Sequence, residues 1–233
     1  MRKNGEKTQD ARGAQRRGAG RPRGRVLSRQ LILETGLRLI DERGEAGAGM
    51  RAIAQELGVR PSSLYNHVSG RDELIAGIRE LISDRIDTSA FDAEPWHQAL
   101  HDWAHAYRAA FAAHPPTITM FAVAPLEPGS RTALMYDRVC EALHGAGWPR
   151  ERVLTIVVAL ESFILGSALD SSAADDMLDP GSRIDTPAFT AAYHERARLL
   201  AGTGERPADA AFQAGLAAMI AGLRAEFAAL PRG

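Results

Sequence analysis

The stretch "MRAIAQELGVRPSSLYNHV", Met50–Val68, contains two short helical patterns separated by a glycine turn. In the first pattern, Ile53 and Leu57 have the spacing of one buried helical face, and Gly58 is placed to end the helix. Pro61 suits the first turn of the second helix, where its missing N–H costs no helical hydrogen bond. Two short helices joined in this way are typical of a helix-turn-helix unit.

The second helix of this unit carries many small polar side chains. Leu64 and Val68 have the spacing of core residues, which leaves a polar set on the other faces: Ser62, Ser63, Tyr65, Asn66 and His67. Small polar residues at the start of a recognition helix let the backbone approach DNA and form hydrogen bonds with phosphates and base edges. The alternative is a helical hairpin with a solvated polar face, which spacing alone does not exclude.

Helical patterns continue on both sides of this unit. Ser28 is placed as the N-cap of a helix with apolar residues at Leu33, Leu37 and Ile40. On the other side, Ser69 followed by Asp72 predicts a capping box that opens a helix over about 71–88. We therefore expect an all-α chain, with a helix-turn-helix domain over 25–72 and a second helical domain over 73–233.

The charge of the chain is distributed unevenly. The net charge is −1, yet residues 1–25 hold nine basic and two acidic residues, which gives +7 there and leaves −8 on the rest. Residues 1–24 contain almost no large apolar side chains, so we expect them to form a flexible basic arm. A basic tail on an acidic body favours a polyanionic partner.

Other features favour a soluble cytoplasmic protein with no membrane partner. Cys140 is the only cysteine, so no disulfide can form within one chain, and a reducing compartment fits. We expect Cys140 to be a buried small apolar residue rather than a redox sensor. No apolar stretch follows the basic N-terminus, as a secretory signal would require. No run approaches the roughly 18 apolar residues of a membrane span.

The longer stretch "LILETGLRLIDERGEAGAGMRAIAQELGVRPSSLYNHVSGRDELI", within residues 27–75, resembles the DNA-binding domain of the TetR family of bacterial repressors. The resemblance lies in the apolar first helix, the "AIAQELGV" helix, the "LYNHV" segment and a basic residue four positions after the histidine. It implies an N-terminal three-helix DNA-binding domain and a C-terminal helical domain for effector binding and dimerisation. The implied function is a homodimeric transcriptional regulator, most often a repressor that a small-molecule effector releases from a palindromic operator on double-stranded DNA.

The resemblance also implies roles for single residues. Tyr65 and Arg71 correspond to phosphate contacts, and the Tyr65 ring also packs against the first helix. Arg51 is expected to meet a phosphate or a guanine, with a solvated side chain as the alternative, and His67 orients or packs its neighbours or touches DNA itself. The expected base readers are Arg60, Ser62, Ser63 and Asn66, of which Arg60 could fork to a guanine.

The basic arm contains a second DNA-binding pattern. "GRPRGR", Gly20–Arg25, resembles the core of an AT-hook, in which arginines lie in a narrow minor groove. A thin charged strand suits a groove only about 6 Å wide with enhanced negative potential. We therefore expect Arg21, Arg23 and Arg25 to bind DNA. The alternative is a tail that adds only sequence-independent phosphate attraction.

An aromatic stripe begins the second domain. Trp96, Leu100, Trp103, Tyr107 and Phe111 recur at helical spacing, which indicates core packing, a ligand pocket, or both. We expect the pocket to take an apolar or aromatic effector that the sequence does not identify. Its expected lining residues are Trp103, Tyr107, Phe111, Phe121 and Phe163.

Enzymatic and metal chemistry lack sequence support. There is no P-loop, no Gly-x-Ser-x-Gly, no His-Glu-x-x-His and no Cys-His ligand set, so we expect no catalytic residues and no cofactor. His97, His101 and His105 recur every four residues, but the outer two would lie about 12 Å apart along a helix, too far to share one ion easily. A solvated or pocket-rim face is the preferred interpretation. A purely architectural DNA-binding protein without an effector is the remaining alternative.

Two long helices are expected near the C-terminus. Residues 150–170 are apolar on nearly all faces, and residues 207–230 alternate large apolar residues with Ala and Gly. In the resembling family, the two longest late helices of each subunit pair into a four-helix dimer bundle. An ordinary core within one subunit is the alternative.

Overall fold

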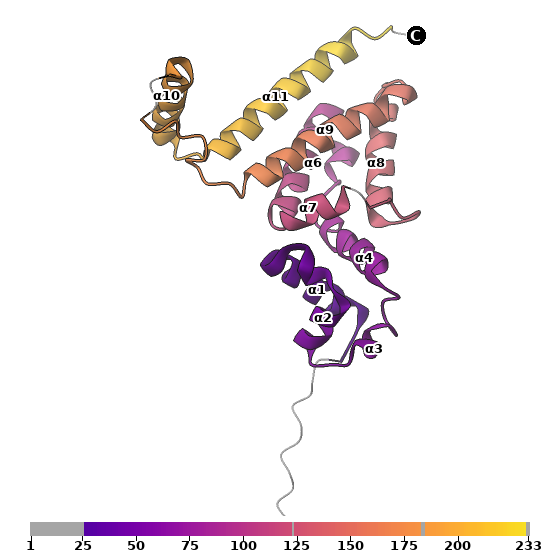
Figure 1. Cartoon of the computed structure of the whole chain (residues 1–233). Coiled ribbons are helices and arrows are strands. Elements are labelled where there is room, and N and C mark those ends of the chain that lie inside the picture. The colour runs from indigo at the N-terminus through magenta and orange to yellow at the C-terminus, as the bar shows by residue number, and fades with distance from the viewer. Residues whose placement is uncertain (1–25, 123, 183–184, 232–233) are drawn as a thin grey trace, which may run out of the picture.

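The computed structural model describes residues 26–122, 124–182 and 185–231. Throughout these ranges the chain forms helices and connecting turns, with no strand, which confirms the expected all-α fold (Figure 1). The smaller N-terminal unit consists of α1 (Arg29–Arg43), the 3-10 helix η1 (Gly44–Ala48), α2 (Met50–Leu57) and α3 (Pro61–Leu64). It continues into α4 (Arg71–Ser83), which leads to the larger C-terminal unit.

Local capping signals set the ends of the first helices. The Ser28 side chain accepts a hydrogen bond from the Leu31 N–H at 3.2 Å, so Ser28 is the N-cap of α1, as predicted. Gly58 ends α2 in the left-handed conformation, with φ of 66°, which a glycine adopts without steric cost. Pro61 stands in the first turn of α3, as expected.

The structure differs from the prediction around the segment between α3 and α4. The α3 helix ends at Leu64, and only turns continue to Val68, whose N–H donates to the Leu64 carbonyl at 3.0 Å. α4 begins at Arg71, as expected, but it ends at Ser83 and not near residue 88, and Glu73, not Asp72, accepts the Ser69 backbone N–H at 2.7 Å. This hydrogen bond lowers the pKa of the Glu73 carboxyl by stabilising its charged form.

The C-terminal unit is built around two long helices that pack together, α6 (Trp96–Ala112) and α9 (Arg150–Asp170). This part of the chain also contains three shorter helices: α5 (Ala90–Ala93), α7 (Pro116–Phe121) and α8 (Arg131–Gly145). By length and composition, α9 is apolar enough to cross a membrane, which the prediction had missed. In this fold, one face of α9 forms core with α6 and α8, and Val157, Leu160 and Ile164 there are fully buried.

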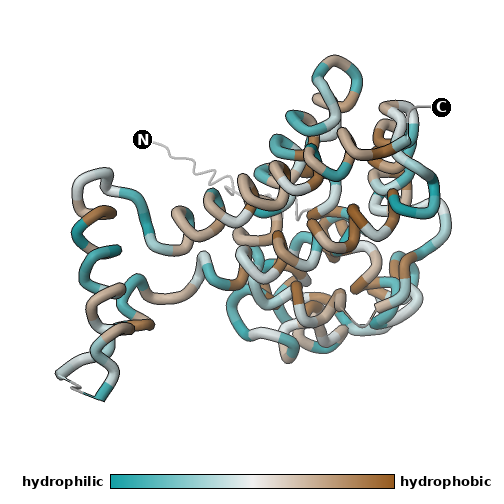
Figure 2. The backbone as a smooth tube through the Cα atoms, turned by 90° about the horizontal axis from the view of Figure 1, so that it is seen from above, coloured by the Kyte–Doolittle hydropathy of each residue, from teal (hydrophilic) through white to brown (hydrophobic). Residues whose placement is uncertain are grey.

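The last two helices extend away from this body. α10 (Pro187–Thr203) stands at its outer side, and α11 (Pro207–Ala228) runs back from it across α6 and α9 (Figures 1 and 2). Leu200 is the only residue of α10 in the described chain that is buried, while Leu199 is 70% exposed. The apolar side chains of α10 are therefore largely uncovered in a single subunit.

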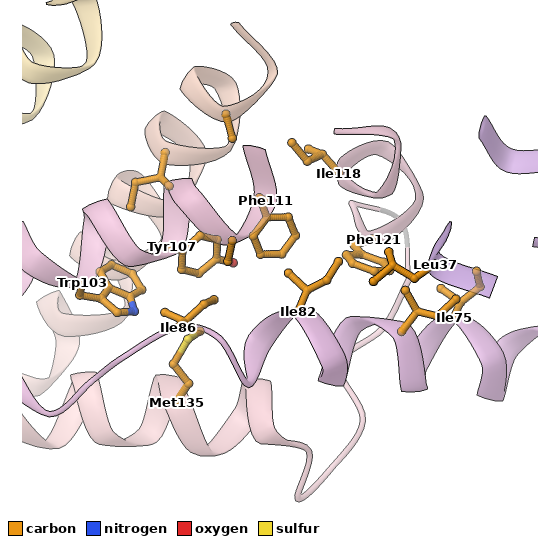
Figure 3. Packing of buried hydrophobic residues seen from close by; sticks show 14 of the residues in the cluster. Leu37, Ile75, Ile82, Ile86, Trp103, Tyr107, Phe111, Ile118, Phe121 and Met135 are labelled. Atoms are coloured by element: carbon orange, nitrogen blue, oxygen red, sulfur yellow. The ribbon is translucent and has the colours of Figure 1, made fainter. Parts of the chain in front are cut away.

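The two units share one apolar core. Buried side chains of α1 and α4, such as Leu37, Ile75 and Ile82, continue into the aromatic side chains Phe111 of α6 and Phe121 of α7 (Figure 3). Protein interiors are close-packed and transmit displacements, so α4 must adjust when α6 or α7 shifts. α4 is thus packed against both the helix-turn-helix and the C-terminal unit.

Candidate DNA-binding surface and effector cavity

The helix-turn-helix presents a polar, exposed face. Arg60, Ser62, Tyr65 and Asn66 are all exposed around α3, and the Tyr65 ring is 54% exposed. Among the described residues, the side chains of these four form no hydrogen bond with the protein. Leu64 points into the core at 0% exposure and fixes the orientation of this face. The donors and acceptors of the face are therefore available to a partner such as DNA.

The remaining residues expected at DNA lie around this face in different environments. Arg51 at the start of α2 is exposed, whereas Ser63 and His67 are half-buried. Arg71, in the first turn of α4, is exposed but pairs with Glu45 of η1 at 2.5 Å. Exposed ion pairs contribute little stability, so Arg71 can exchange Glu45 for a phosphate at small cost. Arg21, Arg23 and Arg25 of the arm lie outside the described residues.

A cavity of about 370 Å³ lies in the C-terminal unit beside α4. Its apolar wall includes Phe111, Ile118, Phe121 and Leu165, and its polar wall includes Glu161. The full lining consists of Arg79, Ser83, Tyr107, Phe111, Ile118, Phe121, Ala122, Ala124, Leu126, Thr132, Tyr136, Glu161, Ser162 and Leu165. An apolar enclosure with a few convergent polar groups is the usual construction of a small-molecule site.

The polar end of the cavity is a hydrogen-bonded group of three side chains. Tyr107 of α6 donates its hydroxyl proton to Glu161 Oε1 of α9 at 2.7 Å, and Tyr136 of α8 donates to the same oxygen. Burial, with the neighbouring Tyr136 and Glu161, raises the pKa of Tyr107, and burial with Glu161 raises the pKa of Tyr136. Both phenols therefore stay protonated and remain donors to Glu161.

Three of the five predicted effector residues line this cavity: Tyr107, Phe111 and Phe121. Trp103 and Phe163 do not. Trp103 is buried at 1% exposure, edge-on to Tyr107, and so lies behind the cavity wall. Phe163 stacks on Phe212 of α11, with ring centroids 5.7 Å apart, because it occupies another face of α9.

Five polar lining residues were not predicted from the sequence: Arg79, Ser83, Thr132, Tyr136 and Ser162. Glu161 was likewise not among the predicted effector residues. Tyr136 lies in a helix whose apolar residues include Leu134, Met135 and Val139, so no periodic signal sets it apart. The contacts of Arg79 are with backbone carbonyls, to which the sequence gives no pointer.

The three histidines of the stripe, His97, His101 and His105, are half-buried, and none of them lines the cavity. Within the described ranges, no three His, Cys, Asp or Glu side chains are grouped as metal ligands. His101 bonds Asp102 at 2.9 Å, and its ring lies 4.6 Å from that of His105. His105 packs edge-on to Phe212, and burial is the main cause that lowers the pKa of His105 below its ordinary value. Cys140 is half-buried and not fully buried as expected, and burial raises the pKa of its thiol, which favours the unreactive protonated form.

An exposed polar helix-turn-helix attached to a larger helical unit with its own cavity defines a class of protein: a DNA-binding regulator with a separate ligand-binding domain. Comparisons with known families identify the family within this class. Residues 32–78 match the family "Bacterial regulatory proteins, tetR family", and residues 90–227 match "Tetracyclin repressor-like, C-terminal domain". The chain belongs to the TetR family, and it is a DNA-binding transcriptional regulator, not an enzyme.

Individual relatives agree with this assignment. The chain is 28% identical to the tetracycline repressor protein class C of Escherichia coli over 203 residues, covering 84% of this chain and 90% of that protein. It is 26% identical to an HTH-type transcriptional regulator of Saccharopolyspora erythraea, covering 86% of each. Among solved structures, apo ActR of Streptomyces coelicolor superposes with a TM-score of 0.66 at 26% identity, over 85% of this chain and 95% of that one.

ActR has also been solved with a ligand. Its complex with (S)-DNPA superposes with a TM-score of 0.67 at 25% identity, over 86% of this chain and 98% of that one. A structurally similar relative thus accommodates a small molecule within the same fold.

Proposed function

We propose that this protein is a homodimeric repressor that a small molecule binding in the 370 Å³ cavity releases from a palindromic operator. One observation carries the proposal. α4 begins at Arg71 beside the helix-turn-helix, and two of its later residues, Arg79 and Ser83, line the cavity. A ligand in the cavity therefore touches the helix that positions the DNA-reading face.

The release mechanism follows from two-fold symmetry. Two α3 segments on one dimer must match the spacing of successive major grooves, so a modest pivot of α4 in each subunit spoils both contacts together. A ligand shifts this equilibrium only by the difference between its affinities for the two forms. Operator and effector must then weaken each other's binding by the same factor.

The operator contacts that we propose are those of the exposed face and its surroundings. Tyr65, Arg51 and Arg71 suit phosphates, while Arg60, Ser62 and Asn66 suit base edges because they are exposed at the start of α3. Ser63 and His67, being half-buried, suit a supporting role with partial DNA contact. The arginines Arg21, Arg23 and Arg25 are proposed to add minor-groove contacts.

The dimer interface that we propose uses α9 and α11. Leu154 and Val158 of α9 are 60% and 48% exposed, although α9 is among the most apolar segments of the chain. α11 carries mostly Ala and Gly on its outer face, which lets another helix approach closely. Val158→Glu should therefore produce monomers that bind operator poorly, while Leu178→Glu, at an exposed apolar residue outside these helices, should leave dimers intact.

Operator release provides the central test. An operator is first selected with the purified protein from random DNA, and a metabolite library is then screened for compounds that release it. We expect at least one compound to release the wild type but not Leu165→Trp, which fills the cavity. The control Leu199→Trp, on exposed α10, should respond normally. Release that is unchanged in Leu165→Trp would place the effector elsewhere.

A further inference from the structure

We propose that the effector carries an organic ammonium or a similar hydrogen-bond-donating cation that binds Glu161, attached to an apolar, mainly aromatic body. This inference rests on the effector cavity proposed above and specifies the ligand that the cavity selects. The cavity wall leaves a ligand more hydrogen-bond acceptors than donors.

The two phenols at the polar end have no proton to offer. Tyr107 and Tyr136 both donate to Oε1 of Glu161, and each hydroxyl has only one proton. Among the described residues, Oε2 of Glu161 has no hydrogen-bond partner. This end of the cavity therefore presents a carboxylate oxygen and phenolic lone pairs, all of which are acceptors.

Most other hydroxyl protons of the wall are also used within the protein. Ser162 donates to the Val158 carbonyl at 2.9 Å. Thr132 and Ser83 share a 2.8 Å hydrogen bond in which either can be the donor, and Thr132 also lies 3.4 Å from Glu80. Ser162, like the phenols, can therefore only accept from a ligand, and the Thr132–Ser83 pair has at most one proton left to donate.

Arg79 is the one basic residue of the wall, and most of its donors are engaged. Three of its five N–H groups bind the carbonyls of Phe121, Ala124 and Pro125 at 2.7–3.1 Å. Arg79 also lines two neighbouring surface grooves, so it stands where the cavity opens to the surface. Its charge reaches Tyr136, but within the described chain Arg79 and Glu161 form no ion pair.

The chemistry of the wall selects a cation. A carboxylate ligand at the polar end would face Glu161, with few donors left to it on the wall, chiefly the two remaining N–H groups of Arg79, whereas an ammonium would form a charge-assisted hydrogen bond with Glu161. The aromatic rings of Tyr107, Phe111, Tyr136 and Phe121 line the rest of the space and favour both an apolar body and a nearby cation.

Matched probes that share one ring system test this inference. The DNA-free, full-length protein is titrated calorimetrically with 9-(aminomethyl)anthracene, which is an ammonium at neutral pH, with 9-anthracenemethanol, and with anthracene-9-carboxylate. We expect the ammonium to bind about tenfold or more tightly than the carboxylate, with the alcohol between them. Glu161→Gln keeps the size and one oxygen acceptor, and it should abolish this preference. Glu151→Gln, at an exposed glutamate of the same helix, should preserve it.

The outcomes separate this inference from the function on which it rests. If the carboxylate binds as tightly as the ammonium to the wild type, or if the preference survives in Glu161→Gln, the cationic effector is excluded while the cavity remains a ligand site. If no probe binds the wild type, an effector of this cationic aromatic kind is excluded, and the operator-release screen alone decides whether the cavity is the ligand site. If all probes bind Leu165→Trp as they bind the wild type, the cavity is not the ligand site and both proposals are wrong.

Discussion

Arg79 Nη2 of α4 donates to the carbonyl of Phe121, the last residue of α7, at 2.7 Å, and its guanidinium lies 5.0 Å from the centroid of the Phe121 ring. The same side chain donates to the carbonyls of Ala124 and Pro125. α7 and the segment after it are thereby fastened to α4 at the cavity wall. A ligand that displaces Phe121 therefore also displaces α4, which carries the helix-turn-helix.

Arg79→Met should uncouple the cavity from DNA. Methionine keeps an apolar stem against Phe121 but donates no hydrogen bond, so α7 can move without α4. We expect the coupling between effector and operator, typically about 1–3 kcal/mol in allosteric proteins, to fall toward zero while effector-free DNA binding stays near normal. Titrating operator and released effector together measures the coupling. Arg198→Met is the control, since Arg198 pairs with Glu195 of the same exposed helix, α10. Full coupling in Arg79→Met would contradict the proposed role of Arg79.

The DNA-binding unit could be predicted from sequence because its signals are local. Ser28 as a cap, Gly58 as a stop and Pro61 as a start each act within one turn of helix, and all three stand where they were expected. The early end of α3 could not be predicted, because the residues after Leu64 are compatible with both helix and turn.

The cavity could be predicted only in part, since it depends on how separate helices face one another. Tyr107 and Phe111 lie on the buried face of α6, which periodicity indicates. Phe163 lies on α9, which is apolar on nearly every face, so periodicity could not show that it faces Phe212 instead of the cavity. The meeting of Tyr136 and Glu161 depends on the packing of α8 on α9, which no local pattern encodes.

Gly47→Ala should destabilise the DNA-binding unit. A Cβ at Gly47 would lie 2.0 Å from the Leu39 carbonyl oxygen, and this backbone atom cannot move aside as a side chain can. We expect a loss of about 1–3 kcal/mol in the free energy of unfolding, measured by urea denaturation. In Gly145→Ala, at the end of α8, the added Cβ meets nothing within 4 Å, so stability should be unchanged or slightly higher. Equal stabilities of the two variants would show that η1 does not approach α1 this closely.

Deleting residues 1–25 should reduce operator affinity and abolish any preference for A·T-rich flanks. The reason is that a narrow A·T minor groove attracts inserted arginines, whereas phosphates attract any cation. Dissociation constants on operators with A·T-rich and G·C-rich flanks, at several salt concentrations, measure both effects. Replacing Arg21, Arg23 and Arg25 by lysine keeps the charge and should lose only the flank preference. If the deletion lowers the salt dependence of operator affinity but leaves the flank preference unchanged, residues 1–25 bind only phosphates.

Substitutions around α3 should separate residues that position the protein from residues that read sequence. Tyr65→Ala and Arg71→Ala remove proposed phosphate contacts, so they should weaken binding to operator and random DNA by similar factors. Arg60→Ala or Asn66→Ala should instead relax base preference, by about 1–3 kcal/mol at one operator position if the lost contact is bidentate. Binding of each variant to a set of single-base operator mutants resolves the two patterns, with Arg198→Ala on α10 as a control for loss of an exposed positive charge. If Arg60→Ala and Asn66→Ala weaken every DNA equally, these side chains do not read bases, and the sequence preference must come from Ser62 and its neighbours or from DNA shape.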